Sequence, residues 1–319
     1  MTAAVRRRTL LCACVAACGL GGCARATAQP GLDLQTVADG VWFAQGEAAL
    51  GSRENRNFIS NAGVIAAPRG VVLVDALGSP ALARALLVAI ATRTAKPVTD
   101  VIVTHYHADH VYGLQVFAQA GARIIAHRAA RDYLQSEAAR LRLANSIAEG
   151  LTEAGTQLVE ATHWIDGSTA LDIAGERLEL RAVGPAHTAE DLAVWLPARK
   201  VLFAGDLVFR GRVPFVGQAD SRGWIASLDS LLALPALAIV PGHGPLSRTA
   251  REDLQLTRDY LAYLREQMGR AVADFSAFDE AYAATDWRRF EALPLFRAAN
   301  RINAYNTYLL MEQEALQKR

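Results

Sequence analysis

Residues 104–110 read Thr104-His105-Tyr106-His107-Ala108-Asp109-His110, so three histidines and a carboxylate lie within six residues. The apolar run at residues 98–104 predicts a buried strand before them, and a helical segment ending at residue 119 follows. In an extended turn His105 and His107 point to the same side, whereas Asp109 and His110 belong to the start of the helix. One short loop can therefore face two neighbouring metal ions. The alternative is a surface or core histidine cluster, but the preceding strand favours a metal site.

All four cysteines of the chain lie near its N-terminus, at Cys12, Cys14, Cys18 and Cys23. The remaining sequence therefore has no disulfide framework and no cysteine-rich structural zinc site. A metal site must be built from histidines and carboxylates. This donor set favours zinc or iron in a hydrolytic or oxygen-handling site.

The first 28 residues have the pattern of a secretory signal peptide. A basic segment at residues 6–8 precedes an apolar run at 9–20, and Ala26-Thr27-Ala28 resembles a cleavage site. The apolar run is shorter than the about 20 residues needed to cross a bilayer. Arg7-Arg8 fits a twin-arginine export signal, and Leu20-Gly21-Gly22-Cys23 fits a lipoprotein cleavage box that would make Cys23 a lipid anchor. We expect an exported, periplasmic protein, either soluble or lipid-anchored.

The charge balance gives no sign of a nucleic-acid partner. The formal net charge is +1 over 319 residues, and the first 28 residues contribute four arginines and no acidic side chain. The mature chain is thus mildly acidic, which favours a small-molecule substrate over nucleic acid or a membrane surface. Nothing in the sequence indicates an oligomeric state.

Strand and helix patterns alternate along the chain. Strand-like runs occur at residues 41–43, 57–65, 70–75, 98–104, 123–126, 157–165, 171–183, 193–196, 201–204 and 238–240. Helical periodicity covers residues 80–94, the segment ending at 119, 129–154, 252–273 and 278–317. This order predicts an α/β protein in which residues 32–250 form a four-layer αββα sandwich. Residues 251–319 are expected to form a C-terminal helical annex packed on it.

The motif at residues 104–110 and three later segments together resemble the metallo-β-lactamase superfamily, over about residues 37–245. The later segments are Gly184-Pro185-Ala186-His187-Thr188-Ala189-Glu190-Asp191, Leu202-Phe203-Ala204-Gly205-Asp206 and Val240-Pro241-Gly242-His243-Gly244. The resemblance implies one zinc ion held by His105, His107 and His187. It implies a second held by Asp109, His110 and His243, with Asp206 bridging the two.

The resemblance also implies a mechanism. Metal-bound water has a pKa of about 7 instead of about 15.7, so hydroxide is available at neutral pH as the nucleophile. Asp109 would be the catalytic side chain, since it would both bind a metal and orient that hydroxide. Asp75, at the end of the run 71–74, resembles the aspartate that supports a metal ligand in this family.

The ligand pattern differs from both dinuclear lactamase classes. One class has Cys at the position of Asp206 and Arg at that of His110, and the other has Ser at that of Asp206. The set here is similar to that of hydroxyacylglutathione hydrolases and related thioesterases. In addition, residues 205–209 and 300–305 resemble exported zinc hydrolases found with quinoprotein and sulfur-oxidation systems. The resemblance thus implies hydrolysis of a thioester, ester or lactone.

Three other functions stay open. They are a β-lactamase-type amidase, a mononuclear iron sulfur dioxygenase on the same fold, and a non-enzymatic metal-binding protein of a quinoprotein or sulfur-oxidation system. Arg210 and Arg212 are candidates to pair with a substrate carboxylate, although a solvated loop is the alternative. Trp224 is the aromatic residue singled out for a role in the pocket. Asn303 in the helical tail is expected to close the core rather than to overhang the site.

Overall fold

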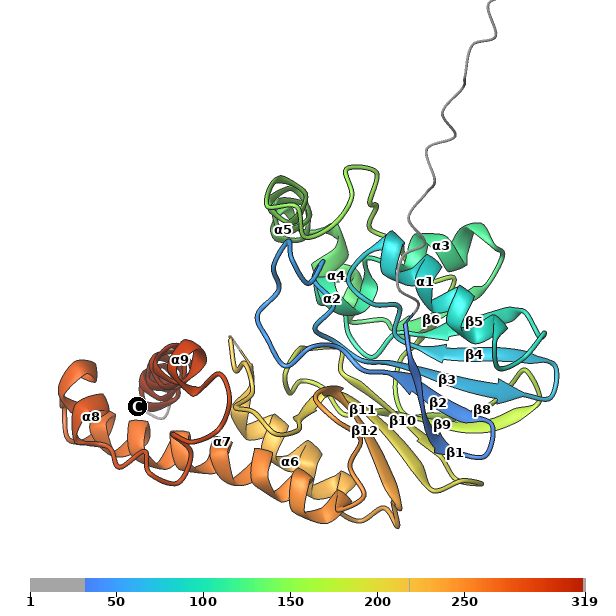
Figure 1. Cartoon of the computed structure of the whole chain (residues 1–319). Helices are drawn as coiled ribbons and strands as arrows, with labels where there is room; N and C mark the ends of the chain where they lie inside the picture. Colours follow the sequence, from blue (N-terminus) through green and yellow to red (C-terminus); the bar gives the residue numbers. More distant parts are fainter. Residues whose placement is uncertain (1–31, 218, 318–319) are drawn as a thin grey trace, which may run out of the picture. The chain divides into compact units, whose positions relative to one another are not determined.

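The computed structural model describes residues 32–217 and 219–317. The predicted signal peptide and the lipid anchor at Cys23 lie outside these residues. Two β-sheets form the centre of the described chain (Figure 1). The seven-stranded sheet contains, in spatial order, β1 (Leu34–Ala38), β2 (Val41–Ala44), β3 (Ala62–Ala67), β4 (Gly70–Val74), β5 (Val98–Ile102), β6 (Arg123–His127) and β7 (His163–Ile165). The five-stranded sheet contains β12 (Ala238–His243), β11 (Val201–Phe209), β10 (Leu192–Leu196), β9 (Glu176–Ala182) and β8 (Thr169–Ile173).

Both sheets are buried on two faces, and this produces four layers. Side chains alternate between the faces of a strand. On β11, Phe203 packs into the apolar core between the sheets, whereas Leu202 packs toward the helices α6 (Ser221–Leu231) and α7 (Ala250–Ala273). On β4, Val72 faces the core between the sheets and Leu73 faces the helices α1 (Pro80–Ala91) and α3 (Leu114–Gln119). The predicted αββα architecture is confirmed.

Parallel pairing brings several loop segments to one edge of the sheets. β4, β5 and β6 pair in parallel, and so do β11 and β12. The segment after β5 leads into the short helix α2 (Ala108–Val111), which carries Asp109 and His110. Since the carboxyl ends of parallel strands share an edge, the residues that follow β4 and β5 are brought together. In the other sheet, the parallel pair β11 and β12 carries Asp206 and His243.

Several predicted elements are shorter or divided. The strand expected from residue 57 begins only at Ala62, because Arg56 and Asn57 adopt positive φ angles of 53° and 58°. The helix expected at 129–154 is split into α4 (Ala130–Gln135) and α5 (Glu137–Ala148) by Ser136, whose side chain caps α5. In the predicted strand at 157–165, only β7 is regular. Helix α6 was not predicted, although its N-cap residue Asp220 was a usable signal.

The C-terminal region is helical, as predicted. Helix α7 is followed by α8 (Phe278–Ala284) and α9 (Phe296–Gln317), and α9 packs along α7 (Figure 1). The hydroxyl of Tyr260 on α7 donates a hydrogen bond to Asn300 Oδ1 and accepts one from Asn303 Nδ2, at 2.8 and 2.9 Å. These helices share one apolar core with the five-stranded sheet. Within the described ranges, no helix combines the length and the apolar character that crossing a membrane requires.

Candidate metal centre

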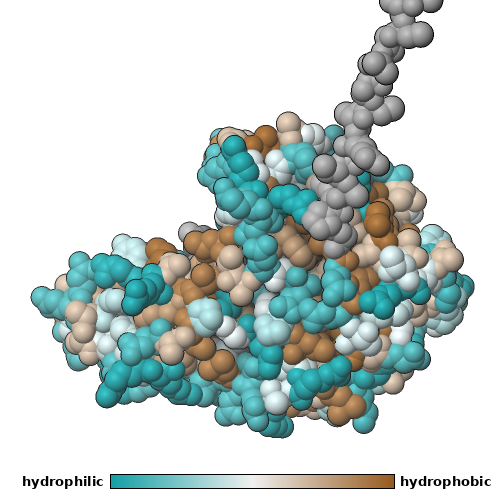
Figure 2. Space-filling view, viewed as in Figure 1, coloured by the Kyte–Doolittle hydropathy of each residue, from teal (hydrophilic) through white to brown (hydrophobic). Residues whose placement is uncertain are grey.

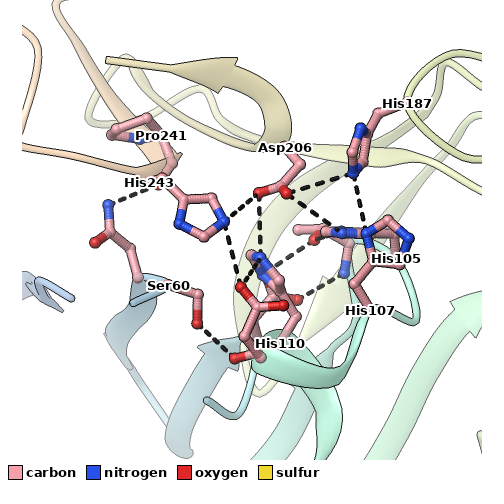
Figure 3. Close-up of polar contacts among 12 residues, drawn as sticks. Ser60, His105, His107, His110, His187, Asp206, Pro241 and His243 are labelled. Atoms are coloured by element: carbon pink, nitrogen blue, oxygen red, sulfur yellow. Dashed lines mark hydrogen bonds and ion pairs between the residues drawn. The ribbon is translucent and has the colours of Figure 1, made fainter. Parts of the chain in front are cut away.

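Seven side chains meet at the edge where β5, β11 and β12 end (Figure 3). They fall into two groups, and within each group the potential ligand atoms lie within 4.8 Å of one another. The first group is His105, His107, His187 and Asp206, and the second is Asp109, His110 and His243. The structure thus brings together all seven residues that the sequence predicted as ligands.

The first group converges on one oxygen of Asp206. Nε2 of His187 lies 3.0 Å from Nδ1 of His107. Oδ2 of Asp206 lies 3.4 Å from Nε2 of His187 and 3.7 Å from Nε2 of His105. Three imidazole nitrogens and one carboxylate oxygen therefore surround a common point.

The second group faces the other oxygen of the same carboxylate. Oδ1 of Asp206 lies 3.1 Å from Nε2 of His110 and 3.3 Å from Nε2 of His243. Oδ2 of Asp109 lies 3.3 Å from Nε2 of His243 and 3.6 Å from Nε2 of His110. Asp206 therefore lies between the two groups and offers one oxygen to each.

The donor atoms are suited to metal ions. Nε2 of His105, Nε2 of His110 and Oδ1 of Asp206 are buried and make no hydrogen bond. Buried polar atoms normally have partners, because leaving one unpaired costs about 1–3 kcal/mol. Imidazole nitrogens and carboxylate oxygens are the ligands of zinc sites that lack cysteine. The cluster therefore fits metal ions in both groups.

The charge states of the two groups differ. Burial lowers the pKa of His107 to about 3 and that of His187 to about 4, so both rings are neutral and ready to bind a metal at pH 7. Burial acts in the same direction on His243, but Asp206 and Asp109 outweigh it and raise its pKa to about 9. A metal in the second group would thus replace a proton on His243.

Hydrogen bonds outside the cluster fix the orientation of its rings. Nδ1 of His110 donates to Oδ2 of Asp75 at 2.9 Å, and Asp75 also accepts from the backbone N–H and the hydroxyl of Thr104, both at 2.8 Å. Nδ1 of His105 donates to Oγ1 of Thr104 at 3.0 Å, and Nδ1 of His243 donates to the carbonyl of Ile59 at 2.7 Å. In each case the hydrogen bond at Nδ1 directs Nε2 toward the cluster, where it can bind a metal once it carries no proton.

Replacing Asp75 by asparagine should weaken metal binding about 10- to 100-fold, as is typical for the loss of a supporting hydrogen bond. Asparagine tolerates the left-handed backbone at this position, where φ is 65°, but its amide nitrogen would face a donor. The measurement is the affinity for zinc in competition with a chelator. Asp100→Asn is the control, because Asp100 is equally buried but pairs with Arg123 away from the cluster. Equal losses in both variants would contradict a supporting role for Asp75.

One glycine lets the bridging carboxylate approach β12. A Cβ atom on Gly242 would lie 2.0 Å from Oδ1 of Asp206 and would collide with the backbone of Gly205. Only glycine leaves this space free. The Pro-Gly-His segment at the end of β12 therefore serves both the approach of Asp206 and the placement of His243.

The predicted substrate residues are placed differently from the ligands. Arg210 pairs with Asp253 on α7, with Nε 2.8 Å from Oδ2, and is not among the residues that line the cavity. Its pairing with a substrate carboxylate stays a prediction. Trp224 is fully buried, donates to the carbonyl of Leu207 at 3.1 Å, and packs against His187 with ring centroids 5.1 Å apart. Trp224 therefore packs against the ring of a ligand from the protein interior and is not exposed to a substrate.

Arg212 is buried as well. Its guanidinium lies 4.9 Å from the ring of Phe215 and 5.5 Å from that of Phe209, and both terminal nitrogens lack a hydrogen-bond partner. Phe215 lines the cavity, whereas Arg212 does not. A role for Arg212 in binding a substrate carboxylate stays a prediction.

A cavity of about 940 Å³ leads to the cluster. Its wall contains residues that sequence reasoning did not assign to the site, namely Arg142 and Ser146 of α5 and Ile302, Asn303 and Asn306 of α9. The expectation that Asn303 only closes the core is therefore incomplete. Its amide does bind Pro214 and Tyr260, but the same residue also lines the cavity. The helical spacing of these residues indicated that they share one face of a helix, but nothing in the sequence showed that this face points into the cavity.

Comparison with known proteins agrees with this geometry. Residues 55–243 match the sequence model of the family described as the metallo-beta-lactamase superfamily, and the chain belongs to that superfamily. A metallo-beta-lactamase type 2 from Bacillus cereus is 30% identical over 218 residues, which cover 67% of this chain and 77% of that protein. A linear primary-alkylsulfatase from Pseudomonas sp. (strain ATCC 19151) is 26% identical over 244 residues, covering 65% of this chain but only 46% of that protein.

A solved structure has the same fold. The metallo-beta-lactamase from Pontibacter korlensis superposes with a TM-score of 0.58 and 24% identity, covering 72% of this chain and 99% of that one. The predicted superfamily and fold are thus confirmed. The narrower resemblance to hydrolases of quinoprotein and sulfur-oxidation systems stays a prediction.

Proposed function

We propose that this protein is an exported binuclear zinc hydrolase that breaks the acyl C–O or C–S bond of an ester, thioester or lactone by attack of water on the carbonyl carbon. The observation that carries the proposal is the position of Asp206, whose two oxygens each face one complete group of ligand atoms. A site for one ion would need only one of these groups. Export is supported by the sequence pattern of residues 1–28.

The seven residues would have two roles, namely binding the metal ions and orienting the attacking water. Two zinc ions held close together supply hydroxide at neutral pH and polarise a substrate carbonyl. His105, His107 and His187 would hold one ion, His110 and His243 the other, and Asp206 both. The side chain of Asp109 is 15% exposed, compared with 5% for Asp206, and Asp109 lines the cavity. It can therefore contribute one oxygen to the second group and orient the attacking water.

The alternative functions would require different ligand residues, a different number of metal ions or no substrate cavity. A β-lactamase-type amidase is supported by the Bacillus cereus relative, but aspartate at position 206 together with histidine at 110 differs from both dinuclear lactamase classes. An iron sulfur dioxygenase needs one ion only, whereas two groups are present. A purely metal-binding protein does not require a cavity of this size beside the cluster.

Metal analysis followed by a hydrolysis screen tests the proposal. The purified mature protein should contain about two zinc ions per chain. It should hydrolyse at least one thioester, ester or lactone of a panel that also contains β-lactams and alkyl sulfates, and hydrolysis of only the latter two would contradict the proposed substrate class. Removal of metal with a chelator should abolish this activity, and added zinc should restore it, since no serine or cysteine nucleophile is expected. About one iron and no zinc per chain, or activity that survives metal removal, would overturn the proposal.

A further inference from the structure

One face of helix α5 is directed at the metal cluster. Ala138, Arg142 and Ser146 are spaced four residues apart and all three line the cavity, together with His107 and Asp109. Residues at this spacing lie on the same side of a helix. Helix α5 buries only Ala139 and Ser146, so most of its surface is not used for packing. Its inward face is therefore available to a bound molecule.

Arg142 brings a positive charge to this face. Among the described residues it makes no hydrogen bond or ion pair within the distances that define them, and no other arginine or lysine lines the cavity. Its side chain is exposed and lines the same cavity as His107 and Tyr133. The guanidinium thus lies at the cavity wall without a partner from the described part of the chain.

The acidic residues of the cavity are engaged elsewhere. Asp109 and Asp206 face the two ligand groups. Oε1 of Glu190 accepts the backbone N–H of Tyr106 at 3.2 Å, and burial raises the pKa of this carboxyl group. An anion that pairs with Arg142 would therefore have to come from a bound molecule.

The rest of the cavity is largely apolar. Leu50 and Ile302 are each 50% exposed, and Phe215 and Leu151 also line the cavity. Arg53, in the loop that carries Leu50, donates to the carbonyl of Glu149 at 3.2 Å and so ties this loop to the end of α5. Figure 1 shows α5 and α9 apart from each other, and Figure 2 shows the surface hollowed between the parts that carry them, with hydrophobic side chains at its border.

We propose that Arg142 binds an anionic group of the substrate, whose apolar part lies between α5 and α9 while its scissile carbonyl meets the metal centre. The substrate class is then a carboxylate-bearing ester, thioester or lactone with an apolar body. Arginine suits this task because its planar guanidinium forms two parallel hydrogen bonds with a carboxylate. The inference rests on the proposed hydrolase function.

The test compares charged and neutral substrates of similar size. The 4-nitrophenyl monoester of glutaric acid carries a carboxylate, and 4-nitrophenyl pentanoate does not. In Arg142→Gln, kcat/KM for the monoester should fall about 10- to 100-fold, mainly through KM, as expected for loss of a hydrogen-bonded charge pair. The value for the pentanoate should change less than about twofold, and Arg142→Lys should retain part of the preference.

Arg140→Gln is the matched control, because Arg140 is exposed on the same helix and donates only to the carbonyl of Gln135. It removes the same charge and should leave both substrates unchanged. Equal losses on both substrates, or an equal effect of Arg140→Gln, would overturn the role of Arg142.

A binding measurement separates this inference from the proposed function. The anilide analogues N-(4-nitrophenyl)glutaramate and N-(4-nitrophenyl)pentanamide can be titrated calorimetrically into the zinc-loaded protein. Arg142→Gln should weaken binding of the glutaramate about 10- to 100-fold and leave the pentanamide unchanged. This result would stand even if no ester were hydrolysed, in which case only the hydrolase proposal would fail. Unchanged glutaramate binding in Arg142→Gln would refute the inference alone.

Discussion

Replacing Asp109 by asparagine should leave a folded protein that has lost its hydrolytic activity. The carboxylate faces His243 and His110 with one oxygen, and its side chain is the more exposed of the two carboxylates in the cluster. Asparagine has the same shape but carries no charge, so it cannot both hold a metal and orient hydroxide. We expect kcat/KM to fall at least about 1000-fold, because several kcal/mol of transition-state stabilisation depend on this arrangement.

Circular dichroism and thermal unfolding would show that the Asp109→Asn variant is folded. The control is Asp132→Asn, in which an exposed aspartate of α4 loses its charge at a distance from the cluster. Its activity should match that of the wild type. Activity of Asp109→Asn near the wild-type level would exclude the mechanism, whatever the metal content.

The second large effect is expected from Asp206→Asn. Only one of the two side-chain atoms that face the ligand groups would still be an oxygen, so one group would lose its carboxylate. Metal content should drop from about two ions per chain to about one or less. Activity should fall by a factor similar to that for Asp109→Asn. Metal analysis and kinetics on the same preparation would connect the two results.

Asp191→Asn provides a matched control for this experiment. Asp191 is also buried near the cluster, but it accepts hydrogen bonds from the backbone and hydroxyl of Thr188 and belongs to neither ligand group. Burial raises its pKa to about 8, so it is mostly neutral at pH 7 and asparagine is a close substitute. The variant should keep both ions. Two ions in Asp206→Asn would contradict the bridging position.

The first ligands could be predicted because their signal is local. His105, His107, Asp109 and His110 follow one strand so closely that the strand direction and the helix start determine where they point. The later ligands His187, Asp206 and His243 depended on resemblance to a family, and the structure brings them to the same place. The four-layer fold followed from the order of strands and helices and from the apolar alternation along them.

The substrate residues could not be predicted in the same way. Nothing near Arg210 in the sequence indicates that its partner is Asp253, 43 positions later. Trp224 is an aromatic residue of the kind that often lines substrate pockets. The packing of α6 instead buries it against the ring of His187. Whether a charged or aromatic side chain is free or engaged depends on which distant elements meet, and sequence periodicity does not contain that information.

The sequence by itself thus determined the fold class and the four ligands at residues 105–110, since these depend on spacing within short segments and on the pattern of buried positions. Resemblance to a family added the superfamily and the three later ligands. The tertiary structure decided which oxygen of Asp206 faces each group, that the ligand supported by Asp75 is His110, and that α5 and α9 form part of the cavity wall. These features arise from contacts between segments far apart in the chain. They are set by the packing of helices on sheets, which positions Arg142 and Asn303 on the same cavity although 160 residues separate them.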